Sequence, residues 1–481
     1  MSPKLRVTIA ASIGVLLAFA GASDLADESF GLAGIVAVCA LWIFFEWRAG
    51  ARPEAWILSV ILFGYIVGSR GFAQFQFSPS IPLLPAETAL LLCTVGLGIR
   101  AALSKSLPIR IDAVNISILL WLGYATARMP WDLEDFGVMA LRDYALAYYA
   151  VFFFLSQYLC RDPASMRLLD RAFTVSFLVL PFTALVDKVA PDFFNEYLTW
   201  NGIPLVYYKS DLISASLVCG SFWFWAKYTK TGTKFWLFPS AVSLLLVGAQ
   251  ESPRAALVAT LAATAAWMCA RRFRIVGFQA AVVAAGIAVS LPVEMFSGRP
   301  LIETKSYEMY ERVVSLVDWT GSHSYQNSNS ANTTDNNQFR RIWWKAVYDE
   351  TMATNPVFGM GFGYDLAARF LAEYNWLAVE EEFTARSPHS ILFTNLGRLG
   401  CAGLGLFLFA LATMVRSASR SFSAVNIDEM AWWSIVITIG VSACFGVVLE
   451  GPMGAVVFWT ALGVAHFKTN ARTETPPAAL P

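Results

Sequence analysis

Charged residues are scarce in this chain. Only 15% of its 481 residues are Asp, Glu, Lys or Arg, whereas 57% are hydrophobic. A soluble domain carries about a quarter charged residues. The composition therefore excludes an ordinary soluble protein and predicts an all-α polytopic membrane protein. Because the formal net charge is zero, the total charge gives no sign of a nucleic-acid partner, and we expect none.

Patterns that bind metals or form disulfides are missing as well. The chain has three histidines and seven cysteines, and the cysteines lie in or beside apolar segments without the spacing of zinc sites or disulfides. They are interpreted as small buried hydrophobes. No Asp-x-Asp or His-x-x-His pair occurs in the long polar segment. We therefore expect no metal and no cofactor.

Apolar stretches of membrane-spanning length make up most of the chain. A spanning helix needs about 20 mostly apolar residues. The first run follows Lys4 and Arg6 and ends in Ala18-Phe19-Ala20, which resembles a signal-peptide cleavage site. Many similar runs follow, so we expect a retained first helix. The sequence predicts fourteen helices, at residues 5–22, 32–47, 55–69, 83–99, 113–127, 144–159, 171–187, 211–226, 235–250, 255–270, 275–292, 389–415, 431–449 and 452–467.

Basic residues are distributed unevenly between the connections. With the N-terminus placed in the cytoplasm, every cytoplasmic connection carries at least two Lys or Arg residues, and the short opposite connections are poor in them or acidic. The positive-inside rule therefore predicts that both ends are cytoplasmic. The expected parts are helices one to eleven in 1–292, an extracytoplasmic loop with short helices in 293–388, helices twelve to fourteen in 389–468, and a disordered cytoplasmic tail in 469–481.

Polar residues gather at the outer ends of the predicted helices. A single charge there can snorkel to the membrane surface or pair with a neighbour. Their number on one side, with both signs of charge, favours a polar cavity that opens outward. The residues are Arg70, Glu87, Arg142, Asp143, Tyr207, Tyr208, Lys209, Asp211, Arg254, His389 and Glu450.

The long polar loop has two halves. The first half is polar and ends in the Ser/Asn/Thr-rich run 323–337, which is predicted to be mobile. In the second half, residues 338–355 place apolar side chains at roughly helical spacing. Asp335 and Asn336 are suited to cap this helix, and Asn355-Pro356 is expected to end it.

Three glycines, Gly359, Gly361 and Gly363, follow the predicted loop helix. A GxGxG run alone is weak evidence for a phosphate loop, and no strand–helix context of a dinucleotide fold or Walker loop surrounds it. The glycines therefore favour a backbone that turns closely against the helices. Pro388 and His389 then lead the chain back into an apolar segment.

Four segments stand in order in the second half of the chain: Arg340–Ala346, Asn355–Gly363, Pro388-His389-Ser390 and Leu396–Gly400. They resemble the signature of the O-antigen polymerase and ligase superfamily, which is an arginine, a tryptophan, P-x-x-G-x-G, a histidine and L-x-x-x-G. The stretch Ser252-Pro253-Arg254-Ala255-Ala256 resembles the family's S-R-x-x element with a proline inserted. Before this region only the helix-rich architecture is similar.

The resemblance implies a GT-C-type glycosyltransferase of the bacterial inner membrane that needs no metal and whose active site faces the periplasm. Its donor is a glycan on undecaprenyl pyrophosphate, held among membrane lipids. A polymerase passes this glycan to another lipid-linked repeat unit, and a ligase passes it to lipid A–core. Fourteen helices suit a polymerase somewhat better. A chain-length regulator is a further partner that the resemblance allows.

The chemistry of such a transfer explains two of the residue types. Charge develops on pyrophosphate oxygens as the glycosidic bond breaks, and a guanidinium group binds phosphate bidentately and stays charged. The incoming hydroxyl must lose a proton, which a histidine can accept near neutral pH. By resemblance, the catalytic residues are His389 and Arg254, and Arg340 or Arg341 binds the pyrophosphate.

Further candidates lie on the same outer side. Lys209 stands where the family often has another basic residue, and Tyr207, Asp211 and Arg142 are candidate substrate-binding residues. Asp211 or Glu450 could instead be the base. Two other functions stay open. A polysaccharide or lipid transporter would need ionisable residues deep in the helices, and a sensor or structural protein would bind a partner with its loop.

Overall fold

The computed structural model describes residues 51–75, 84–104, 109–200, 202–250, 254–318, 323–328, 333–373 and 385–474. Two predicted helices, at 5–22 and 32–47, lie outside the described residues. The same holds for Ser252, Pro253 and residues 475–481 of the predicted tail.

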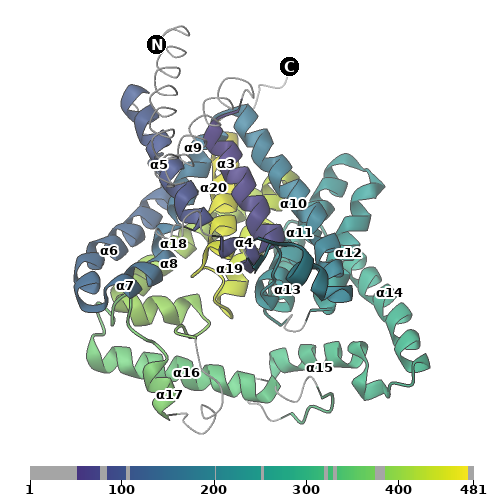
Figure 1. Cartoon of the computed structure of the whole chain (residues 1–481). Helices are drawn as coiled ribbons and strands as arrows, with labels where there is room; N and C mark the ends of the chain where they lie inside the picture. The colour runs from purple at the N-terminus through teal and green to yellow at the C-terminus, as the bar shows by residue number, and fades with distance from the viewer. Residues whose placement is uncertain are drawn as a thin grey trace, which may run out of the picture.

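Helices form nearly all of the described structure (Figure 1). The first half contains α3 (Pro53–Phe63), α4 (Arg70–Ala73), α5 (Pro85–Ser104), α6 (Ala113–Phe136), α7 (Val138–Asp143), α8 (Ala145–Tyr148), α9 (Val151–Cys160), α10 (Pro163–Val189) and α11 (Ser210–Thr231). The second half contains α12 (Leu237–Gly248), α13 (Arg254–Cys269), α14 (Arg274–Phe296), α15 (Lys305–Val317), α16 (Thr333–Thr354), α17 (Ala368–Glu373), α18 (Ile391–Ser423), α19 (Ile427–Ala443) and α20 (Pro452–Glu474).

Short elements connect these helices. Strand β1 (Thr199–Trp200) pairs antiparallel with β2 (Ile203–Pro204), so that Thr199 faces Pro204 and Trp200 faces Ile203. The remaining short elements are two π-helical turns, Gly64–Gly68 and Phe193–Tyr197, and two 3-10 turns, Lys234–Trp236 and Leu301–Glu303.

Several described helices are suited to a membrane by length and composition. Only 11% of the apolar window in α14 is buried inside the protein, so most of its apolar surface needs a lipid environment. The chain is a predominantly helical membrane protein, while the count of fourteen spans and the cytoplasmic ends stay predictions. The long apolar stretches among the described residues are Pro85–Leu103, Val138–Cys160, Pro163–Val189, Arg274–Phe296 and Ile391–Ser423.

Helices α11, α19 and α20 occupy the centre of the bundle (Figure 1). Trp223 on α11 meets Trp432 on α19 edge to face, with ring centroids 4.9 Å apart, and Phe173 on α10 meets the same indole at 4.8 Å. Such edge-to-face pairs add stability beyond the area they bury. These helices are therefore held by protein contacts on most sides.

The end of α20 corrects the prediction of a disordered tail at 469–481. The helix continues to Glu474, because Thr469 is buried between two neighbouring helices. The Thr469 hydroxyl lies 2.6 Å from that of Ser421 and accepts a hydrogen bond from the Trp433 indole at 3.2 Å. The described part of the predicted tail thus belongs to the bundle.

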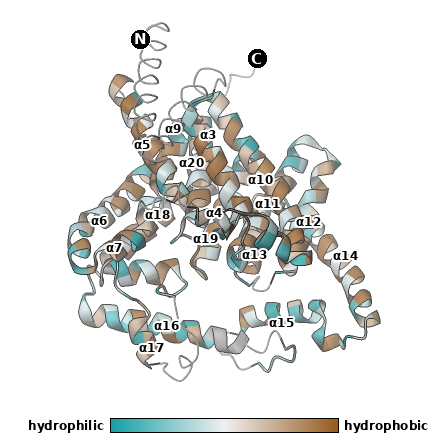
Figure 2. Cartoon of the chain, viewed as in Figure 1, coloured by the Kyte–Doolittle hydropathy of each residue, from teal (hydrophilic) through white to brown (hydrophobic). Residues whose placement is uncertain are grey.

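Helices α15, α16 and α17 lie across one end of the bundle, which we name the loop end (Figure 1). Figure 2 shows that α15 and α16 carry more hydrophilic residues than α5, α10 or α14. Helix α16 begins earlier than the predicted range 338–355, so Asp335 and Asn336 lie inside it and do not cap it. It ends before Asn355-Pro356, as predicted.

Helix α15 has an unusual amphipathic pattern. Its charged residues Glu311 and Arg312 are buried, whereas the Tyr310 side chain is 59% exposed. The Glu311 carboxylate accepts two backbone amides from the segment 323–328, at 2.7 and 3.1 Å. This segment, predicted to be mobile, is therefore fastened to α15.

Helix α18 is broken at Gly400, where the backbone adopts φ 65° and ψ −167°. The turn 356–361 fits into this break, and four backbone hydrogen bonds of 2.7 to 3.1 Å join it to residues 397–402. A side chain at Gly359 would collide with the Gly400 backbone, and one at Gly400 would collide with Val357. This close approach requires glycine at both positions.

The far side of the same turn is held by α6 and α7. Arg128 donates to the Gly359 carbonyl at 3.2 Å. Asp132 accepts the Phe362 amide at 2.8 Å, and Asp143 accepts the next amide at 3.2 Å. The glycines thus form a close backbone turn, as their context in the sequence predicts, and the turn fixes the loop helices on the bundle.

Candidate functional site

Five predicted site residues come together at the loop end: Lys209, Asp211, Arg254, Arg340 and His389, named here the His389 cluster. Lys209 precedes α11, Asp211 lies in its first turn, and Arg254 begins α13. Arg340 belongs to α16. The charges of Arg340, Lys209 and Asp211 act on the His389 ring, and the charge of Arg340 also acts on Arg254. Residues far apart in the sequence thus share one polar region.

His389 is held in a strained backbone conformation. Helix α18 begins at Ile391, so His389 precedes the helix, although the sequence predicts that it begins there. Its φ of 54° lies in the left-handed region, which costs a residue with a side chain free energy. Its ring packs against Trp343, with centroids 5.7 Å apart. Its ring nitrogens make no hydrogen bond within the described part of the chain.

The surroundings of His389 keep its ring neutral. Burial and the positive charges of Arg340 and Lys209 lower the pKa of His389 to about 4, and the charge of Asp211 opposes this shift. The imidazole can therefore accept a proton at neutral pH. An anion bound beside Arg340 and Lys209 would offset their charges and raise the pKa of His389, which makes the ring a stronger base.

Arg340 and Arg341 point in different directions, because neighbouring residues on a helix are about 100° apart. Arg340 faces the cluster, and its burial lowers its pKa while the charge of Asp211 raises it. It forms no ion pair with a described carboxylate. Arg341 is exposed and lines a groove together with Trp344 and Lys345. Of the two predicted phosphate-binding arginines, the geometry favours Arg340.

A non-helical segment forms one wall of the cluster. The sequence predicts a helix over 431–449, but α19 ends at Ala443 and residues 444–451 form turns. The Asp211 carboxylate lies so close to Gly446 that an added Cβ would be 2.9 Å from Oδ2. Irregular backbone is tolerated inside a membrane protein where it lines a polar space, which explains the early helix end.

Arg254 is joined by residues that the sequence analysis missed. The charge of Arg312 and the Tyr325 hydroxyl both act on it. Arg312 forms an ion pair with Glu308 on the same helix. The Tyr325 hydroxyl donates to Asp318 at 3.0 Å, and burial together with this bond raises the pKa of Tyr325 to about 12. In the sequence, the charged residues of α15 are spaced so that they share one helical face. This spacing could have indicated that α15 contributes to the site.

A second polar group supports the backbone next to the cluster. The Glu450 carboxylate accepts hydrogen bonds from the hydroxyls of Ser387 and Thr394, at 2.5 and 2.9 Å. Burial raises the pKa of Glu450. Nearby, Arg398 is 2% exposed and pairs with Asp143 at 2.8 Å. Because Ser387 lies two residues before the histidine, these bonds hold the segment that carries it.

Arg142 and Tyr207 are not part of the cluster. Arg142 is exposed on α7, and its side chain makes no hydrogen bond or ion pair with described residues. Its neighbour Asp143 is the one that turns inward. Tyr207 exchanges backbone hydrogen bonds of 3.1 and 2.9 Å with Gly68 and Arg70, and the Arg70 guanidinium lies 5.7 Å from its ring centroid. The structure gives neither residue a place beside His389.

A different histidine lies in the C-terminal half of α20, away from the cluster. His466 is about 21 Å along α20 from Pro452 and is 2% exposed. Its Nε2 atom lies 3.0 Å from Asp112 Oδ1, and its Nδ1 atom lies 3.0 Å from the Ser417 hydroxyl. Both ring nitrogens are thus satisfied by protein atoms.

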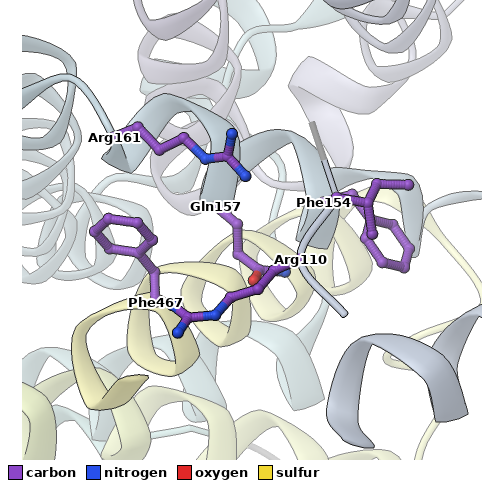
Figure 3. Close-up of a pocket in the computed structure, with 6 residues that line it drawn as sticks. Arg110, Phe154, Gln157, Arg161 and Phe467 are labelled. Carbon is purple, nitrogen blue, oxygen red and sulfur yellow. The ribbon is translucent and has the colours of Figure 1, made fainter. Parts of the chain in front are cut away.

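A small cavity of about 60 Å³ lies beside this second histidine. Figure 3 shows Arg110 and Arg161 on either side of Gln157, with Phe154 and Phe467 beside them. The Gln157 amide donates to Asn115 at 2.8 Å. The volume is sufficient for a few water molecules and is well below that of a small-ligand site.

The His389 cluster contains three cations, one carboxylate and a neutral imidazole. Guanidinium and ammonium groups bind phosphate oxygens, and the imidazole accepts a proton. Within the described residues, no group of three or more His, Cys, Asp or Glu side chains is placed to hold a metal ion. The cluster is therefore suited to bind an anion next to a base. No known protein-family model and no curated protein matches this chain.

Proposed function

We propose that the chain is a membrane glycosyltransferase that polymerises lipid-linked oligosaccharide repeat units into O-antigen or exopolysaccharide on the periplasmic face of the bacterial inner membrane. The observation that carries the proposal is the position of His389. Its ring lies beside Arg340 and Lys209 at the loop end of a membrane bundle. The motif resemblance supplies the substrate, a glycan on undecaprenyl pyrophosphate.

In this proposal the cations bind the leaving group. As the bond between the sugar C1 carbon and the pyrophosphate oxygen breaks, negative charge grows on the phosphate oxygens. Arg340, Arg254 and Lys209 stabilise that charge, and their partial burial makes each interaction stronger than it would be in water. Asp211 next to Lys209, 3.5 Å away, orients the ammonium group.

His389 acts as the general base. It takes the proton of the attacking hydroxyl while that oxygen forms its bond to C1 and the lipid pyrophosphate departs. The pyrophosphate partly cancels the charges of Arg340 and Lys209, so substrate binding raises the pKa of His389 when the base is needed. The proton then passes to the released pyrophosphate or to water, and the ring returns to its neutral form.

The proposal is tested in a strain that lacks the gene. His389→Ala and Arg254→Ala variants are expressed, and the surface polysaccharide is separated on a gel. We expect loss of the chain-length ladder in both, whereas His323→Ala, which changes an exposed histidine of the loop, keeps it. Normal ladders in the two cluster variants would refute the assignment.

The same strain separates the polymerase from the alternative, an O-antigen ligase. A gene deletion that leaves single repeat units on lipid A–core identifies a polymerase. A deletion that leaves long chains on undecaprenyl pyrophosphate identifies a ligase.

A further inference from the structure

A groove of about 600 Å³ runs along α16 on a face that does not point into the His389 cluster. This volume falls in the range of small-ligand sites, about 300–1,000 Å³. Half-buried side chains form its floor, and exposed ones form its rim. The floor consists of Ile342, Trp344 and Phe393, and the rim consists of Gln338, Arg341, Lys345 and Tyr348.

The rim is rich in hydrogen-bond donors. An amide, a guanidinium, an ammonium and a phenol project from it, and no carboxylate is among the described residues that line the groove. Lys345 pairs with Asp349 one turn further along the helix, which holds its ammonium group at the rim. This set of groups fits a ligand whose edge carries many oxygen acceptors.

The floor is rigid and is connected to the proposed base. The Trp344 indole stacks on Phe393 with centroids 5.1 Å apart and planes 12° apart. Its Nε1 atom donates to the carbonyl of Pro388 at 2.7 Å. The neighbouring Trp343 packs on the His389 ring. The groove floor therefore contacts the segment that carries His389.

We propose that this groove binds the sugar chain of the acceptor substrate and presents its attacking hydroxyl to His389, an inference that rests on the proposed function. A pyranose ring has an apolar C–H face, which fits the aromatic floor, and a periphery of oxygens, which fits the donor rim. An isoprenoid tail would instead require an apolar rim.

The groove is tested with the full chain purified in detergent. The probes are short repeat-unit oligosaccharides released by mild acid from the surface polysaccharide of the producing strain, and binding is measured by calorimetry. The double variant Lys345→Ala/Tyr348→Ala should bind them about tenfold more weakly or worse. It should also raise the KM for the acceptor with little change in kcat. Tyr310→Ala, which removes an exposed tyrosine of α15, should leave both values unchanged.

The outcomes separate this inference from the proposed function. His389→Ala should lose transfer but bind the oligosaccharides as the wild type does. If the groove variant binds and reacts normally while His389→Ala is inactive, the groove inference is wrong and the proposed function stands. If His389→Ala stays active, the proposed function is wrong, and calorimetry still decides the groove. Undecaprenyl phosphate that binds in the groove, where the oligosaccharides do not, would assign it to lipid and overturn the inference.

Discussion

His389 and His466 lie at different depths of the same bundle and have opposite surroundings. His466 is enclosed between Asp112 and Ser417, and each of its ring nitrogens lies 3.0 Å from an oxygen. His389 has no hydrogen-bond partner among the described residues, and two positive charges act on it. A satisfied polar network holds helices together. A base that the protein leaves unsatisfied among cations is arranged for a ligand.

The largest contrast is expected from the two alanine substitutions. His389→Ala should reduce transfer by about 10²–10⁴-fold, because it removes the proposed general base. His466→Ala should leave transfer per folded molecule near normal but lower the free energy of unfolding by about 1–3 kcal/mol, because Asp112 and Ser417 lose a buried partner. Polymer yield and detergent-based thermal unfolding measure the two effects. The reverse pattern would exchange the roles of the two histidines.

The cations provide the next test. Arg340→Ala should reduce transfer by about 10²–10³-fold, because it removes charge stabilisation of the leaving group. It should also raise the pKa of His389, because a positive charge that disfavours its protonation is gone. Nitrogen-detected NMR of labelled histidine measures this pKa. For this pKa, Arg341→Ala is the control, because Arg341 does not act on His389. An unchanged pKa of His389 in Arg340→Ala would show that Arg340 and His389 are not coupled.

A side chain added to a glycine of the turn 356–361, which packs against α18, should destabilise the protein more than one added to a glycine within a helix. A side chain at Gly359 would collide with the Gly400 backbone, and the φ of 73° at Gly359 disfavours alanine. Gly359→Ala should therefore lower the free energy of unfolding by about 1–3 kcal/mol and reduce activity by displacing the loop. Gly405→Ala, where nothing lies within 4 Å, should be neutral or stabilising by about 0.5–1 kcal/mol. Thermal unfolding of both variants checks this contrast.

The last contrast is a difference in acid sensitivity. The pKa of His389 falls from 6.5 to about 4 on folding, so the unfolded chain binds more protons between these values. The contribution of His389 to the free energy of unfolding is therefore lost as the pH falls from about 6.5 to 4. At Asp112, burial is outweighed by hydrogen bonds from His466 and Asn115, which lower its pKa from 3.8 to about 2. That contribution is complete above pH 3.8 and is lost towards pH 2.

Two variants should separately remove these two pH dependences of the free energy of unfolding. His389→Gln should flatten the pH dependence of unfolding between about 6.5 and 4, and Asp112→Asn should flatten it between about 4 and 2. Tryptophan fluorescence during denaturant unfolding in detergent follows both. A His389→Gln profile with the wild-type slope would mean that this ring is not buried among cations.

The positions of the helices were predictable because apolar runs are a local property of the chain. The twelve predicted ranges that fall on described residues, from 55–69 to 452–467, each overlap helical structure. The stop at Asn355-Pro356 was equally local. The end of α19 was not, because turns at 444–451 depend on the approach of Asp211 to Gly446 from another helix.

The candidate site was predictable only in part, for a related reason. The motifs indicated His389, Arg254 and either Arg340 or Arg341. The sequence does not distinguish these two adjacent arginines, because the direction of each side chain depends on how the helix packs. The charge of Arg142 suggested a binding residue, although it is Asp143 that turns inward to Arg398. Contacts between distant segments decided these cases, and no local pattern encodes them.

The break in α18 determines which segment of this protein could be exchanged as one structural unit. The predicted membrane topology divides the chain at residue 388, but the turn 356–361 and residues 397–402 lie on opposite sides of that boundary and share four backbone hydrogen bonds. A chimera that exchanged only the loop with a related chain would pair one half of this joint with a foreign second half. The smallest segment that could be transplanted intact therefore extends from the start of α16 through residue 402.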